Sequence, residues 1–196
     1  RLEVRPQGFD FADDDARRNR KNLGLDFAEA VFAPDGKAFV LDYGGQVRLI
    51  DPLSGKEMRR FGSEGQFRSA LVVTPDSRTL IASAWGDRQV GQHPVALFDL
   101  SSGGALQRLL LSGTVGGPVA ISADGRTFAT SVEEPQRQIL VYEIASGNLR
   151  ARVRGVPDRV WSLAFLPDGH RLASGLTNSA ALIWDLAVPE ILHKEP

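Results

Sequence analysis

The sequence predicts an all-β fold built from four consecutive units, each a four-stranded antiparallel sheet. Three observations predict it. A turn of the Pro-Asp-Gly type recurs four times at intervals of about 44 residues. A second acidic marker follows each turn in the same order, and no segment is long and periodic enough to predict a major helix. Two independent markers that recur at one period indicate a repeat architecture.

The first marker is a turn between the first and second strands of each unit. Its four copies read FAPDGKAFV, VTPDSRTLI, ISADGRTFA and FLPDGHRLA, with the acidic residue at Asp35, Asp76, Asp124 and Asp168. Pro fixes φ, Asp accepts hydrogen bonds from nearby backbone, and Gly tolerates positive φ. Each copy therefore predicts a tight turn.

The strands of each unit follow from the apolar segments around these turns. WSLAF (161–165) and SALVV (69–73) are examples of the first strand, and RTLIASA (78–84) of the second. The third strand ends at the second marker, in VRLIDPLSG, VALFDLSSG, ILVYEIASG and ALIWDLAVP, where the acids are Asp51, Asp99, Glu143 and Asp185. Ser-Gly turns then lead into a more charged fourth strand, such as KEMRRF or NLRARVR, with EILHK as a short one in the last unit.

Composition is typical of one globular domain, with 196 residues, 42% hydrophobic and 24% charged. The formal net charge of −1 predicts neither a nucleic-acid nor a membrane partner. The chain has no cysteine, which excludes disulfides and thiolate metal sites. It shows no apolar run of membrane-spanning length and no signal-peptide pattern. We expect a cytoplasmic protein, and the first residue, Arg1, suggests a fragment or a processed chain.

From about residue 27 to the C-terminus, the repeated units resemble the WD-repeat β-propeller family. The closest match is RVWSLAFLPDGHRLASGLTNSAALIWDL, residues 159–186. The resemblance implies four degenerate WD repeats forming propeller blades at about 27–64, 65–112, 113–155 and 156–196. Such propellers usually have more blades, so it implies an open arc of a larger ring. Residues 1–26 form an N-terminal strand, RLEVR, and a charged connection.

The resemblance also implies a side-chain network that ties Ser, Asp and Trp of a blade to a His of a Gly-His pair. Ser174 and Trp184 match this pattern, whereas Asn178 stands where Asp is expected and Val156 where His is expected. The other blades also lack Gly-His, so we expect the network to be broken in every blade. Stability should then depend on apolar burial and strand ladders.

The four expected blades allow two arrangements of the two ends of the chain. In the first, which we favour, RLEVR is the outer strand of a missing or truncated blade, and the four blades form an open arc. In the second, RLEVR pairs with the final blade and closes a compact four-bladed ring. Unpaired strand edges invite association, so the open arc predicts self-association, with two arcs forming an eight-bladed ring as one route.

The sequence offers no recognisable catalytic or phosphate-binding set. Neither His93, His170 nor His193 lies in a His-Glu-x-x-His motif, and no Gly-x-Ser-x-Gly motif occurs. The regular spacing of the marker acids indicates that they build turns. We therefore expect a non-catalytic protein without cofactor or metal. Two alternatives stay open: an enzyme with its site at the central channel, and a regulatory or sensory segment of a larger catalytic protein.

The family resemblance places the loops between second and third strands, and those between blades, on one face that often binds partners. The candidate residues for binding a protein or peptide are Trp85, Arg88, His93, Glu133, Glu134, Arg137, Arg159 and Trp161. The residues aligned with Trp161 in the other blades are all small: Ala28, Ser69 and Gly117. Binding energy should therefore concentrate near Trp161 and Arg159. The alternative for Trp161 is partial burial against a neighbouring blade.

Overall fold

The computed structural model of the chain describes residues 29–43, 46–62, 70–83, 92–112, 117–133 and 136–187. Within these ranges all regular structure is β. The strands form four antiparallel sheets, three with four strands and one with three. In every sheet, strands that follow one another in the chain are hydrogen-bonded neighbours. The predicted all-β fold of repeated antiparallel sheets is thus confirmed.

The four sheets follow the order of the chain. The first contains β1 (Ala30–Phe32), β2 (Phe39–Tyr43), β3 (Gln46–Ile50) and β4 (Glu57–Phe61). The second contains β5 (Ala70–Val73), β6 (Thr79–Ser83), β7 (Gln92–Asp99) and β8 (Ala105–Ser112). The third contains β9 (Val119–Ile121), β10 (Thr127–Val132), β11 (Gln138–Glu143) and β12 (Leu149–Val153). The fourth contains β13 (Val160–Phe165), β14 (Arg171–Leu176) and β15 (Ala181–Asp185). The expected strands RLEVR and EILHK lie outside the described residues.

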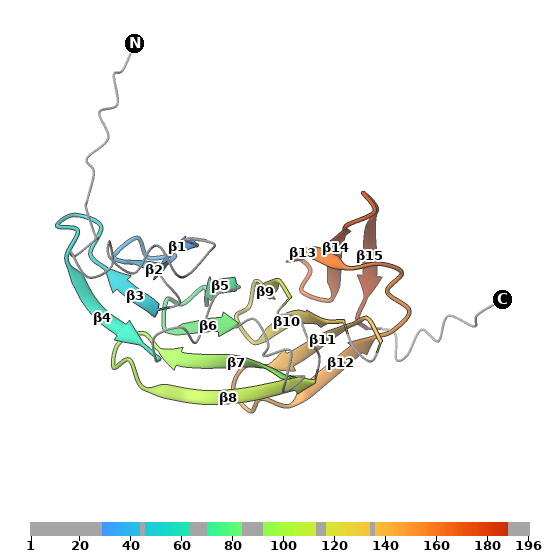
Figure 1. Cartoon of the computed structure of the whole chain (residues 1–196), viewed down its shortest axis with the longest axis horizontal. Helices are drawn as coiled ribbons and strands as arrows, with labels where there is room; N and C mark the ends of the chain where they lie inside the picture. Colours follow the sequence, from blue (N-terminus) through green and yellow to red (C-terminus); the bar gives the residue numbers. More distant parts are fainter. Residues whose placement is uncertain are drawn as a thin grey trace, which may run out of the picture.

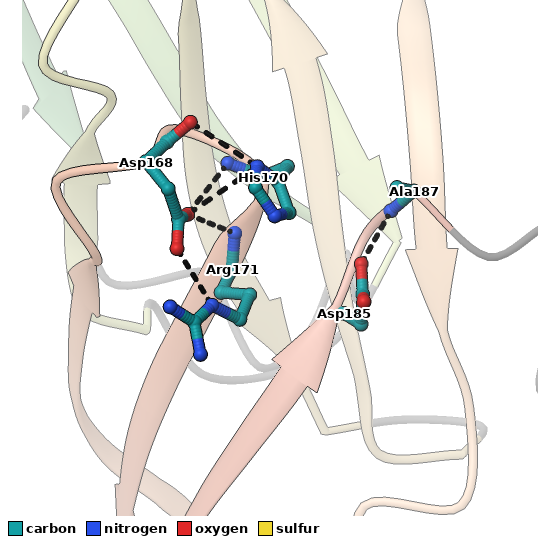
Figure 2. A network of polar contacts seen from close by, with 5 residues as sticks. All are labelled: Asp168, His170, Arg171, Asp185 and Ala187. Carbon is teal, nitrogen blue, oxygen red and sulfur yellow. Dashed lines mark hydrogen bonds and ion pairs between the residues drawn. The ribbon is translucent and has the colours of Figure 1, made fainter.

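The four predicted turns between first and second strands form. In each of them the aspartate accepts a hydrogen bond from the backbone N–H two residues further on. The donors are the N–H groups of Lys37, Arg78, Arg126 and His170, at 3.0 to 3.1 Å. Figure 2 shows the last of these turns. There Asp168 also accepts from the backbone and the guanidinium of Arg171, at 2.9 and 2.6 Å. These contacts fix the start of β14.

The second set of acids closes the turns that end the third strands. Asp99 accepts hydrogen bonds from the Ser101 hydroxyl at 2.6 Å and from the backbone and hydroxyl of Ser102. These bonds stabilise the charged carboxylate and lower the pKa of Asp99 to about 2. A folded pKa below the unfolded value means that this stabilisation is present above about pH 4 and is lost as the pH falls toward 2. Asp185 closes the corresponding turn through the Ala187 N–H at 2.9 Å (Figure 2).

The sheets stand side by side along an arc (Figure 1). β1, β5, β9 and β13 follow one another along its inner side, each close to the next, and β4, β8 and β12 lie on its outer side. The first and fourth sheets stand at opposite ends of the arc, and the described strands form no closed sheet.

Three apolar cores fill the spaces between neighbouring sheets. Val40 and Leu80 belong to the core between the first and second sheets, Phe128 to the next, and Ile139 and Leu172 to the last. All five side chains are fully buried. Burial of one such side chain contributes about 1.5–3 kcal/mol, so the interfaces between sheets hold the arc together.

Polar links also join neighbouring sheets near the outer strands. The guanidinium of Arg59 donates to the carbonyl of Ser102 at 2.6 Å, and the amide of Gln107 donates to the carbonyl of Ser146 at 3.2 Å. Gln107 of the second sheet occupies the same position as Arg59 of the first, opposite Leu97 and Leu49 respectively. The link is therefore a repeated feature.

Glycine is required in the turns whose carbonyl groups accept these hydrogen bonds. Gly147 has a φ of +68°, and a Cβ there would lie 1.7 Å from Nε2 of Gln107. Gly103 in the preceding sheet has a φ of +77°, and its Cβ would lie 2.5 Å from Cδ of Arg59. The glycines of these two Ser-Gly turns thus make room for a side chain of the preceding sheet.

Part of the expected side-chain network forms in the fourth sheet. The indole Nε1 of Trp184 donates to the hydroxyl of Ser174 at 2.9 Å. Val156, where the family has His, is buried in the apolar core between the third and fourth sheets. In the third sheet the equivalent of Ser174 is Thr130, whose buried hydroxyl has no hydrogen-bond partner among the described residues. The described part of the fourth sheet thus combines apolar burial at Val156 with the hydrogen bond between Trp184 and Ser174.

Replacing Thr130 with valine is expected to stabilise the protein by about 1 kcal/mol, because it removes a buried, unsatisfied hydroxyl with little change of shape. The melting temperature should rise by about 2–4 °C. Ser174→Ala is the opposite case. It leaves the indole of Trp184 without its acceptor and should cost about 1–2 kcal/mol. A lower melting temperature for Thr130→Val would show that the hydroxyl is satisfied.

Candidate protein-binding surface

Two of the predicted residues meet where the third and fourth sheets adjoin. Glu133 follows β10, and Arg159 lies in the link between β12 and β13. Oε1 of Glu133 and Nε of Arg159 form an ion pair at 2.9 Å, although the residues are 26 positions apart in the sequence. The loop after a second strand and the link between two sheets therefore share one end of the sheets, as predicted.

Trp161 stands beside this ion pair on a β-bulge. In the pairing of β13 with β14, Val160 lies opposite Leu176 and Ser162 opposite Gly175, so Trp161 is the extra residue. A bulge redirects the side chain of its extra residue. The indole is 72% exposed, whereas Val160 is buried. The indole is therefore not buried against the third sheet, and burial against a following blade stays open, because no described sheet follows the fourth.

The backbone that carries Trp161 is held on both sides. The Arg159 N–H donates to Oδ1 of Asp158 at 2.7 Å, and the Arg159 carbonyl accepts from the Thr177 N–H at 3.0 Å. The pKa of Asp158 is lowered, first by the bond from Arg159, then by the Thr177 hydroxyl and by the charge of Arg137. A preorganised backbone reduces the entropy lost when a partner binds.

We call the group formed by Glu133, Arg137, Asp158, Arg159 and Trp161 the Trp161 surface. Its charges are balanced, because it contains two acids and two arginines together with one tryptophan. The ion pair of Arg159 with Glu133 is partly exposed and contributes at most about 1 kcal/mol to stability. Its main effect is to fix the two side chains. Tryptophan and arginine are the residues that most often dominate binding at protein interfaces.

The other predicted site residues are placed differently or not at all. Trp85, Arg88 and Glu134 lie outside the described residues. His93 was predicted in a loop, and this is wrong, since it lies in β7 opposite Leu111. The neighbouring Pro94 pairs with Leu110 of β8.

Two acidic residues at the same end of the sheets were not among the predicted site residues. The sequence could have indicated Asp158, because Pro157-Asp158 repeats the dipeptide of the predicted turns. Nothing in the repeat indicated Glu29, since the aligned residues in the other units are Ala70, Pro118 and Ser162. Its Oε2 accepts the Leu71 N–H at 3.0 Å and so joins the first sheet to the second. Burial raises the pKa of Glu29, the bond from Leu71 opposes this rise, and the charge of Asp42 adds to it.

Comparison with known proteins gives no further guide to function. No protein-family model matches the chain, and no curated protein is significantly similar to it. Within the described ranges, no three His, Cys, Asp or Glu residues gather where they could hold a metal ion. The same ranges contain no helix that is long and apolar enough to cross a membrane. A functional assignment therefore depends on the Trp161 surface and on the arrangement of the sheets.

Proposed function

We propose that this chain is a non-catalytic scaffold of the WD-repeat β-propeller type that binds a protein or peptide through the Trp161 surface. The propeller arrangement is supported by four antiparallel sheets that follow one another along an arc (Figure 1). The bond from Trp184 to Ser174 joins two positions at which the chain matches the family pattern. In this proposal the four sheets are degenerate blades and the arc is part of a larger ring.

The observation that carries the binding function is the exposure of Trp161. An indole that is 72% exposed on a soluble sheet leaves a large apolar area in water. Full burial of a tryptophan covers about 150–250 Å², and each Å² contributes about 25 cal/mol. The gross gain available to a partner is thus several kcal/mol, enough for Trp161 to act as the main anchor.

The flanking charges define the chemistry of the partner. Arg137 is exposed and its charge acts on Asp158, and Arg159 keeps about a third of its side chain in contact with water. A peptide that places an apolar side chain on Trp161 and a carboxylate next to either guanidinium satisfies both features. The ligand class is therefore a peptide segment with an apolar anchor and an adjacent acid.

A random peptide library displayed on phage tests this function directly. We expect peptides selected on the wild-type chain to bind Trp161→Ala at least about 30-fold more weakly, a loss of roughly 2 kcal/mol. The control is Leu53→Ala, which removes an apolar side chain that is 90% exposed in the turn between β3 and β4. Peptides that bind both variants equally well, or the absence of any selected peptide, would contradict the proposal. Circular dichroism checks that both variants are folded.

A further inference from the structure

The three interfaces between sheets repeat one arrangement. We call the face that a sheet turns toward the following sheet its leading face, and the opposite one its trailing face. On the leading face of the first three sheets, Leu49, Leu97 and Val141 occupy equivalent positions in the third strand, and each is at most 6% exposed. Their equivalent in the fourth sheet is Ile183, which is 64% exposed.

The first sheet shows the matching feature on its trailing face. Val73, Ile121 and Phe165 are equivalent residues at the ends of β5, β9 and β13, and each packs in the core shared with the preceding sheet. The equivalent residue at the end of β1 is Phe32, which is 65% exposed. Its ring lies beside that of Phe39, with 5.7 Å between the ring centroids. The two ends of the arc thus expose the two halves of the interface that the chain forms three times internally.

Large aromatic side chains of the trailing face also pack against smaller ones of the leading face. In the core between the third and fourth sheets, the leading face contributes Ala129, Ala151, Ile139 and Val141, and the trailing face contributes the large Phe165 and Trp184. The leading face of the fourth sheet consists of smaller residues. It carries Ala164, Ala173, Gly175, Ala181 and Ile183. Phe32 supplies the large aromatic group on the trailing face of the first sheet.

We propose that the leading face of the fourth sheet binds the trailing face of the first sheet of a second copy of this chain. The contact continues the internal interface and joins two different surfaces, so it is heterologous. Two copies satisfy both exposed faces at once and give a ring of eight sheets, within the range of four to eight blades found in propellers. This ring rests on the proposed propeller arrangement.

One feature of the trailing face limits the strength of this contact. Arg48 occupies the position that Ala96, Leu140 and Leu182 hold in the other sheets. Its guanidinium lies 3.4 Å from Oε2 of Glu57, so the charge is already paired within the first sheet. Desolvating this pair costs part of the apolar gain, and the dimer should therefore be reversible.

Light scattering coupled to size-exclusion chromatography tests the proposal on the 196-residue chain. We expect a species of twice the 21.3 kDa mass of one chain, in equilibrium with the monomer. Ile183→Asp and Phe32→Lys should each weaken self-association roughly tenfold or more, because each places a charge on an apolar contact. Both positions are exposed in the single chain, so the variants should remain folded.

The decisive sample is an equimolar mixture of these two variants. One interface of the mixed dimer then places Asp opposite Lys, and the other joins the unchanged Phe32 and Ile183, so we expect the dimer to return. A dimer formed by two leading faces or by two trailing faces would not be restored by mixing the variants. Leu53→Asp is the control for surface charge and should leave the dimer unchanged. A monomer at all concentrations, a dimer that neither variant weakens, or a mixture that stays monomeric would overturn the proposal.

Discussion

Replacing Phe128 with alanine is expected to lower the free energy of unfolding by about 3–5 kcal/mol. Phe128 is fully buried in the core between the second and third sheets, and its ring stacks on that of Tyr142 with 5.4 Å between the centroids. The substitution removes this contact and leaves a cavity that closely packed sheets can fill only in part. Urea unfolding followed by circular dichroism measures the change.

Leu110→Ala is the matched control for this prediction. Leu110 lies in β8 of the second sheet, but its side chain is 59% exposed. Its removal should change the free energy of unfolding by less than about 1 kcal/mol. Equal losses for the two variants would contradict the position of the core between the sheets.

Gly147→Ala is expected to cost about 2–3 kcal/mol, the second large effect. An alanine at a φ of +68° is strained by roughly 1–2 kcal/mol. Its Cβ would also displace the amide of Gln107, which loses its bond to the Ser146 carbonyl, worth about another 1 kcal/mol. Thermal and urea unfolding of the variant provide the measurement.

Two further variants separate these contributions. Gly169 has a similar φ of +75° but nothing within 4 Å of its Cβ position, so Gly169→Ala should show the backbone strain alone. In a Gln107→Ala background, Gly147→Ala should cost no more than Gly169→Ala, because the displaced amide is absent. If the extra cost persists in that background, the glycine is not needed to admit Gln107.

The strands could be predicted from the sequence because their boundaries are set by local contacts. The carboxylate of Asp168 bonds to the backbone of His170 and Arg171, two and three residues away, so the dipeptide Pro167-Asp168 already marks the turn. The expected first strand of the last unit, residues 161–165, differs from the observed β13, Val160–Phe165, by one residue at its start. The meeting of Glu133 and Arg159 at one end of the sheets followed from the same repeated strand order.

The features that escaped prediction depend on residues far apart in the sequence. The acceptor of Gln107 lies 39 residues away, and nothing near Gly147 indicates that it must admit that side chain. The bulge that exposes Trp161 arises from the register of β13 against β14. The position of His93 within β7 depends on the register of β7 against β8. Such registers are set by packing between strands and between sheets, which a short sequence pattern does not encode.

The three cores between neighbouring sheets make the molecule a one-dimensional series of units. The second and third sheets are each covered on two faces, whereas the fourth is covered only by the third among the described sheets. In such a series, stability is approximately a sum of intrinsic terms and nearest-neighbour terms. Opening of the fourth sheet breaks one interface, and opening of an inner sheet breaks two. Amide protection should therefore be highest in β5–β12, and unfolding should begin at the ends and move inward.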